Sequence, residues 1–161
     1  MKIVFVMGPA FSGKSMYIRR EFPGAETVNI SPFQKAVYAA ESNEEISAIG
    51  MNADLYCMEE LRQRVQRASE NTVIVLEHHL LRKEERAKYL EAVRQMSDAP
   101  VECIVLLPAE ETVAKILEHN ETLIRFHQYE KEKMEMPDAS EGFACIRTES
   151  PEFSPEEWKR N

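Results

Sequence analysis

The sequence predicts an α/β fold in which helices cover both faces of a five-stranded, mostly parallel sheet. Two observations predict it. Short apolar runs alternate with segments of helical periodicity, and a glycine-rich loop joins the first run to the first helix. Such alternation favours right-handed crossovers between parallel strands. A chain of 161 residues is long enough for one domain of this three-layer kind.

The predicted strands are the apolar segments of the chain. The run at residues 3–7 is continuous and ends at a glycine, which is typical of a strand buried on both faces of a sheet. The other predicted strands cover residues 26–30, 73–76, 101–107 and 143–148. We therefore expect one domain over residues 1–148 and an acidic, solvated C-terminal tail over 149–161.

The predicted helices follow the strands. Ser31 is followed by a proline and, three residues after the serine, by Gln34, which is a capping-box pattern. A helix that opens at Pro108 has acidic residues in its first turn and His119 in its last, as the helix dipole favours. Another predicted helix begins at residue 13. The remaining predicted helices cover residues 52–70, 83–96 and 122–134.

Composition limits the partners. The net charge of −8 and the sequence pI of about 5.1 argue against extended nucleic-acid binding. Arg62, Arg64 and Arg67 could form a basic strip for an anionic substrate, but only part of the trio shares a helix face, so we favour a solvated face.

Cysteine usage and the chain start predict a cytoplasmic protein. Cys57, Cys103 and Cys145 are odd in number and lack the spacing of a zinc site or a disulfide framework, so we interpret them as reduced core residues. The first apolar run is too short for a signal peptide, and no segment approaches the about 20 apolar residues of a membrane span.

The strongest motif is GPAFSGKS, which begins at Gly8, directly after the first predicted strand and before a helix. In such a phosphate-binding loop, backbone amides face the phosphates, Lys14 reaches the β- and γ-oxygens, and the Ser15 hydroxyl ligates Mg²⁺. The competing interpretation is an ordinary glycine turn with an exposed lysine. The predicted strand before the loop and the predicted helix after it argue against this interpretation. The predicted nucleotide-binding residues are Gly8, Pro9, Ala10, Phe11, Ser12, Gly13, Lys14, Ser15 and Met16.

Glu77 is the second candidate. It ends the third predicted strand, at the sheet edge where α/β proteins bind ligands, and its carboxylate could hold a water of the Mg²⁺ shell. A surface glutamate in a loop is the alternative. His78 and His79 have no metal-ligand spacing, and adjacent residues of an extended loop point to opposite sides, so we do not expect them to bind metal.

These motifs resemble the polynucleotide-kinase-like group of small P-loop kinases. The resemblance covers residues 1–148 and rests on GPAFSGKS, on VIVLEHH as the strand that ends in an acid, and on SEGFACI as the final loop and strand. It implies the P-loop NTPase fold of nucleotide kinases, ATP with Mg²⁺ as phosphoryl donor, and an acceptor hydroxyl opposite the γ-phosphate. It also implies cationic residues after the fourth strand, where this chain has Lys115, followed by His119, Arg125 and His127.

The sequence departs from this family where a catalytic base is expected. Such kinases carry an Asp just after the second strand, but here NISPFQK has no acid. The spacing singles out none of the acids that follow, which are Glu41, Glu44, Glu45 and Asp54. In the lid, Lys115 can act as a point charge but cannot make the bidentate contacts of arginine, and a solvated lysine is an equal alternative.

Two functions follow from these observations. The first is a kinase in which Lys14, Lys115 and Glu77 are catalytic, Ser15 and Glu77 hold the metal, and the acceptor is a small molecule or a nucleic-acid end. The second is a nucleotide-binding regulatory module that retained the phosphate loop without efficient chemistry. A nucleotide hydrolase is a weaker third, because no water-positioning residue is evident.

Overall fold

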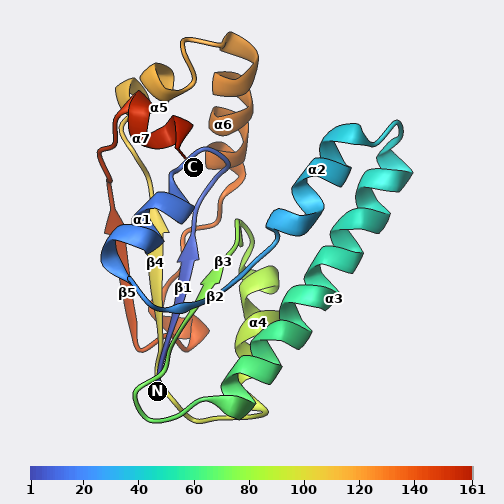
Figure 1. Ribbon diagram of the computed structural model, residues 1–161. Helices are drawn as coiled ribbons and strands as arrows, with labels where there is room; N and C mark the ends of the chain where they lie inside the picture. The colour runs from blue at the N-terminus through green and yellow to red at the C-terminus, as the bar shows by residue number, and fades with distance from the viewer. Residues whose placement is uncertain (161) are drawn as a thin grey trace.

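The computed structural model describes residues 1–160, apart from the side chains of Gln34, Lys35, Val37 and Tyr38. Its centre is a five-stranded sheet of order β2-β3-β1-β4-β5 in which every neighbouring pair is parallel, as predicted (Figure 1). The strands are β1 (Lys2–Met7), β2 (Glu26–Asn29), β3 (Val73–Glu77), β4 (Val101–Leu106) and β5 (Cys145–Glu149).

Helices cover both faces of this sheet and extend beyond its carboxyl edge. The α2 helix and the first part of α3 extend past this edge on one side, and α5, α6 and α7 lie on the other (Figure 1). The helices are α1 (Lys14–Glu21), α2 (Ser31–Ala39), α3 (Asn43–Arg67), α4 (Lys83–Arg94), α5 (Glu110–Ile116), α6 (Glu121–Lys133), α7 (Pro155–Lys159) and the 3-10 helix η1 (Ala139–Glu141).

The central strand β1 shows why the sheet has two buried faces. Ile3, Phe5 and Met7 pack into a core with α3 and α4, whereas Val4 and Val6 pack on the other face with α1. Because side chains of a strand alternate between the two faces, a continuous apolar run is buried on both. The layers predicted from this run are therefore confirmed.

Two helix boundaries differ from the prediction. The α3 helix begins nine residues earlier than expected, at Asn43, because the Ser42 side chain accepts a hydrogen bond from the Glu45 amide at 3.2 Å and caps the helix start. The α5 helix ends at Ile116, and His119 follows it with a positive φ of 57°. His119 is thus not in the last turn of the helix. The predicted capping box of Ser31 involves Gln34, whose side chain lies outside the described residues.

The C-terminal segment is more ordered than a solvated tail. It contains α7, and Phe153 is only 9% exposed because it packs with Met16 and α5 in a small cluster. Its acidic residues remain on the outside, where Glu157 pairs with Arg20 at 2.8 Å. Acidic composition predicted the solvated face but did not predict that Phe153 and Trp158 pack in this cluster. The domain boundary at residues 148–149 stays a prediction.

The cysteines are free, but they are not all core residues. Cys57 and Cys103 are buried, and Cys145 is exposed on edge strand β5. The interpretation of Cys145 as a core residue is wrong because β5 pairs with β4 on one side and has no neighbouring strand on the other. Over residues 1–160, no helix combines the length and the hydropathy that a membrane span requires.

Candidate functional site

The phosphate-binding loop connects β1 to α1 at the carboxyl edge of the sheet. Gly8 and Gly13 have φ angles of 156° and 79°, and a Cβ atom on Gly8 would lie 2.7 Å from the Leu106 carbonyl oxygen. A Cβ atom on Gly13 would lie 2.4 Å from the Phe153 ring. Both positions therefore require glycine, for backbone conformation and for close approach of neighbouring segments.

Lys14 is folded back onto this loop. Its Nζ donates hydrogen bonds to the carbonyl oxygens of Gly8 and Pro9, at 3.0 and 2.9 Å, and to Ser12 Oγ at 3.3 Å. Burial lowers the pKa of Lys14 to about 8, although the carboxylates of Glu77 and Glu130 favour its charged form. A phosphate that enters the loop would offer this partly desolvated ammonium a stronger partner than neutral carbonyl oxygens.

The predicted metal-site residues lie in contact. The Ser15 hydroxyl donates a hydrogen bond to Glu77 Oε1 because the β1–β3 register sets Glu77 opposite Val6, at the start of the loop. A hydroxyl and a carboxylate oxygen are the kind of ligands that Mg²⁺ accepts when phosphate and water supply the others. The described residues contain no cluster of three or more His, Cys, Asp or Glu that could hold a metal alone.

The two histidines after Glu77 point to different elements, as expected. His78 Nε2 donates to Asp54 of α3 at 3.0 Å, and His79 Nδ1 lies 3.4 Å from Glu130 of α6. The Leu80 amide donates to His78 Nδ1 at 3.2 Å, which leaves the proton of the neutral ring on Nε2. His78 thus has partners on both nitrogens.

The α6 helix binds the phosphate loop at Ala10, a contact that was not predicted. The Ala10 amide donates to Glu130 Oε1 at 2.7 Å, and His127 Nδ1 donates to the Ala10 carbonyl oxygen at 2.6 Å. Burial would raise the pKa of the Glu130 carboxyl, but hydrogen bonds and charge from His79, and the Ala10 amide, hold it below its usual value. An anionic side chain thus accepts a hydrogen bond from an amide of the predicted phosphate loop.

Replacing Glu130 with alanine is expected to raise the affinity for ATP or ADP. The carboxylate competes with phosphate for the Ala10 amide and repels it, so its removal should strengthen binding by about tenfold, or about 1.4 kcal/mol. Titration calorimetry with each nucleotide measures the change. Glu132→Ala is the matched control, because Glu132 is an exposed residue of the same helix. Weaker binding in Glu130→Ala would show that Glu130 maintains the loop instead of competing with the ligand.

A cavity of about 450 Å³ opens from the loop. One side of it is the loop with Glu77, Phe126 and Trp158, and the other side comes from α2 and α3. On the second side the lining residues are Phe33, Gly50, Ala53 and Asp54, together with Ile30, which lies between β2 and α2, and His78 also lines the cavity. Asp54 is the one member of the group Glu41, Glu44, Glu45 and Asp54 that lines the cavity.

The predicted lid cations do not line the cavity. Lys115 lies on the exposed face of α5, where its Nζ is 3.3 Å from Glu111 Oε1 and its side chain is 59% exposed. Arg125 is also exposed, whereas His127 is buried against the loop. The catalytic role of Lys115 stays a prediction. In the α3 helix, Arg62 and Arg64 pair with neighbouring glutamates, as expected for a solvated face.

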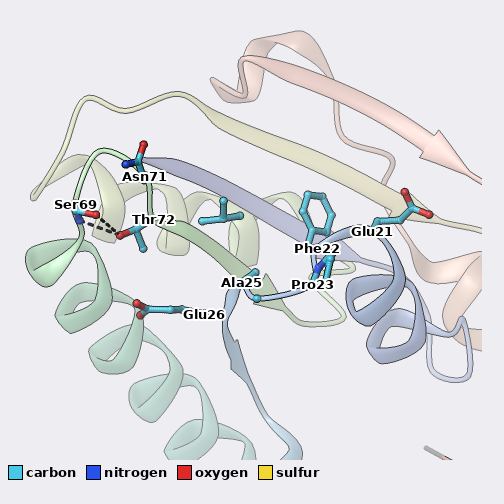
Figure 2. Close-up of a pocket in the computed structure, with 10 residues that line it drawn as sticks. Glu21, Phe22, Pro23, Ala25, Glu26, Ser69, Asn71 and Thr72 are labelled. Carbon is cyan, nitrogen blue, oxygen red and sulfur yellow. Dashed lines mark hydrogen bonds between the residues drawn. The ribbon is translucent and has the colours of Figure 1, made fainter.

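A second cavity, of about 510 Å³, lies at the opposite edge of the sheet. Figure 2 shows its residues, which come from the end of α1, the start of β2 and the turn before β3, where the Ser69 amide donates to Thr72 Oγ1 at 2.9 Å. This is the amino edge of the strands. Because α/β sheets bind ligands at the carboxyl edge, we assign the functional site to the smaller cavity.

Comparison with solved structures agrees with this architecture. A protein described as a kinase from Chloroflexus aurantiacus J-10-fl superposes with a TM-score of 0.67, at 11% identity over 92% of this chain and 84% of the other. This chain has the same fold, with helices on both faces of a parallel sheet. A fungal RNA kinase gives a TM-score of 0.60 at 12% identity, over 98% of this chain and 82% of the other.

Other proteins with the P-loop kinase fold act on small molecules. A shikimate kinase from Acinetobacter baumannii, solved in complex with shikimate, has a TM-score of 0.55 and 12% identity, over 99% of this chain and 90% of the other. No family model matches the sequence, and no curated protein matches it. At these identities the similarity establishes the fold alone.

Sequence reasoning found the donor side of this site and missed most of the other side. GPAFSGKS and Glu77 were named because a motif and a strand end mark them. Glu130 carries no such mark, and His127 was named only as a lid residue, since the contacts of both with Ala10 arise where α6 packs on the loop. One signal was available for Asp54. The buried residues of α3 recur at helical spacing, and Asp54 directly follows one of them, Ala53.

Proposed function

We propose that this protein is an ATP-dependent kinase that transfers the γ-phosphoryl group to a hydroxyl of a small molecule or a nucleic-acid end. The observation that carries the proposal is one cavity that is lined on one side by the phosphate loop and on the other by residues of α2 and α3, a side that we call the chamber. A protein that only held nucleotide would not need that chamber. The neighbours with this fold, an RNA kinase and a shikimate kinase, support both classes of acceptor.

In this proposal, the residues from Gly8 to Met16 bind the donor nucleotide. The loop amides hold phosphate oxygens, and Lys14 exchanges its carbonyl partners for the β- and γ-phosphates. Phosphate must also displace Glu130 from the Ala10 amide. Binding thus exchanges contacts within the protein for stronger contacts with charged oxygens, while His127 of α6 still holds the Ala10 carbonyl oxygen.

Ser15 and Glu77 are the proposed holders of Mg²⁺. Bound there, the ion would neutralise charge on the phosphates as transfer proceeds. The Ser15 hydroxyl would ligate directly, and Glu77 would orient a water of the metal shell. Their hydrogen bond in the present structure keeps the two oxygen ligands together at the mouth of the loop.

A transfer assay tests the proposal. The protein is incubated with Mg²⁺ and ATP labelled at the γ-phosphate, together with a panel of alcohols, sugars, nucleosides and oligonucleotides with free 5′-hydroxyls. We expect label to move to at least one acceptor class. In parallel, fluorescence of Trp158, the single tryptophan of the chain and a lining residue, measures nucleotide binding.

The two measurements separate the alternatives. Label transfer together with a Trp158 response supports the kinase. A Trp158 response with intact ATP across the whole panel would contradict it and would favour a regulatory nucleotide-binding module. No response to ATP or ADP at millimolar concentration would contradict nucleotide binding itself.

A further inference from the structure

The chamber, which is the side of the cavity lined by α2 and α3, has apolar walls and one carboxylate, that of Asp54. Ile30, Phe33 and Ala53 form its walls on this side, and Phe126 reaches it from α6. Phe33 also packs on Tyr56 with ring centroids 5.4 Å apart, so the wall is backed by a second ring. These side chains favour an acceptor with apolar surface, because burial of such surface stabilises the complex.

Asp54 is held in this chamber by two donors. His78 Nε2 donates to Asp54 Oδ1 at 3.0 Å, and the Tyr89 hydroxyl donates to the same oxygen at 2.7 Å. Among the described residues, Oδ2 has no hydrogen-bond partner, and the side chain is 46% exposed. One carboxylate oxygen is therefore fixed, and the other is free to accept a hydrogen bond from a ligand.

The donors keep this carboxylate ionised. Burial would raise the pKa of Asp54, but the hydrogen bonds from His78 and Tyr89 outweigh it and hold the pKa below its ordinary value. The proton on His78 Nε2 is set by the Leu80 amide, which occupies the other ring nitrogen. Backbone geometry thus orients the histidine, and the histidine orients Asp54.

Asp54 is linked to the donor side of the cavity through His78 and also lines the same cavity as the loop. Its partner His78 directly follows Glu77 in the chain, and Glu77 accepts the hydrogen bond of Ser15 in the phosphate loop. The structure thus supplies a carboxylate from α3 in the chamber that faces the phosphates. The segment after β2, where an acid was expected, has none.

We propose that Asp54 holds the acceptor hydroxyl through its free oxygen, and that the acceptor is an uncharged or cationic alcohol with a largely apolar body. This inference rests on the proposed kinase function and extends it to the acceptor. Asp54 gives the acceptor side of the cavity a carboxylate, which repels an anionic acceptor and attracts a cationic one. In the proposed function Lys14 binds the donor phosphates, so its charge is not available to an anionic acceptor.

The chemical step balances with ATP as the donor. The acceptor oxygen forms a bond to the γ-phosphorus, and the bond from that phosphorus to the β–γ bridging oxygen breaks, releasing ADP. The hydroxyl proton passes to Asp54 Oδ2 and then to solvent. Because the transition state of such transfer is loose, Asp54 contributes mainly by orienting the hydroxyl for in-line attack.

The first test replaces Asp54 with asparagine, which keeps the size and the hydrogen bond from Tyr89. We expect kcat for label transfer to fall by about 10²-fold, within the range that a positioned acid or base contributes. ATP binding, read from Trp158 fluorescence, should change by less than about twofold, since Asp54 touches no loop residue. Asp54→Glu should recover part of the lost rate.

Glu59→Gln is the matched control, since it removes an exposed carboxylate from the same helix. It should leave kcat, KM and ATP binding unchanged. If Asp54→Asn transfers phosphate as fast as the unmodified protein, Asp54 does not hold the acceptor hydroxyl, although the protein is still a kinase. If the unmodified protein transfers to no acceptor, the kinase proposal fails, and this inference fails with it.

The second test compares three acceptors of nearly equal shape. They are 1-phenylethane-1,2-diol, which is neutral, 2-amino-1-phenylethanol, which is cationic, and mandelate, which is anionic. Quenching of Trp158 in the presence of a non-hydrolysable ATP analogue measures their binding without turnover. We expect the neutral and cationic probes to bind at least about tenfold more tightly than mandelate, and Asp54→Asn to remove most of the preference for the cation.

The opposite order would overturn the inference. Tighter binding of mandelate than of the other two probes would show that the chamber selects anions. Equal binding of all three, unchanged in Asp54→Asn, would show that the carboxylate does not face the acceptor. Gly50→Leu is a second variant that tests the position of the chamber, since a Cβ on Gly50 meets no atom within 4 Å. It should weaken all three probes and leave ATP binding intact.

Discussion

Replacing Lys14 with alanine is expected to weaken ATP binding by about 10²-fold and to lower phosphoryl transfer by a further factor of about 10² to 10³. Lys14 is the cation of the phosphate loop, and its ammonium is buried and ready to exchange two carbonyl oxygens for phosphate. Charge-assisted contacts in a site that excludes water contribute far more than the same contacts in solvent. Calorimetry with ATP and single-turnover transfer of label measure the two effects.

A loosened loop could imitate this result, so a second variant is needed. Lys14→Met fills the same volume without charge, and it should retain the thermal stability of the protein while losing affinity. Lys159→Ala is the control for removal of a lysine, because Lys159 is exposed and pairs with Glu118 at 3.0 Å. ATP binding by Lys14→Met at full affinity would show that the loop does not hold the phosphates as proposed.

The second large effect is on stability. Replacing Arg86 with alanine is expected to lower the free energy of unfolding by about 3 to 5 kcal/mol, because it leaves a buried carboxylate without its partner. Arg86 Nε and Nη2 donate to the two oxygens of Glu141 at 2.6 and 3.2 Å, and the side chains are 0% and 3% exposed. Nη1 also donates to the Leu80 carbonyl oxygen at 2.9 Å. Denaturant unfolding measures the change.

Two comparisons identify the cause. Arg62→Ala removes an arginine whose partner Glu59 is 3.9 Å away on an exposed helix face, and it should change stability by less than about 1 kcal/mol. Replacing both members of the buried pair, as Arg86→Met with Glu141→Leu, should cost much less than Arg86→Ala alone. An equal loss in the double variant would mean that packing, and not the unpaired charge, accounts for the effect.

The arrangement of strands could be predicted because burial leaves a local pattern. Residues 3–7 are all apolar, and only a strand with helices on both faces buries such a run. The long helix was harder to place. The turns that follow its capping residue Ser42 contain no buried residue before Ala53, so the apolar periodicity became visible only further along. Phe153 was missed for a similar reason, since one aromatic residue among acids has no periodicity.

The candidate site also contains one part that could be predicted from adjacent residues and one part that could not. The residues from Gly8 to Ser15 are adjacent in the chain, and their conformation and charge depend on local geometry. The contact between Ala10 and Glu130 joins residues that are 120 positions apart, and that between Asp54 and His78 joins residues 24 apart. No local preference marks such a pair, because Glu130 and Asp54 are ordinary helix residues until the fold places Ala10 and His78 beside them.

The residues of GPAFSGKS were enough to predict a glycine-rich, phosphate-binding type of loop between a buried strand and a helix, since that loop needs glycine at two positions and a lysine beside them. Only the tertiary structure decided what that loop faces. It placed Glu130 on a loop amide and Asp54 in the opposite chamber, and it left Lys115 on the surface. The physical reason is that loop conformation depends on neighbours in the chain, whereas the electrostatics of a cavity depend on which distant helices pack around it.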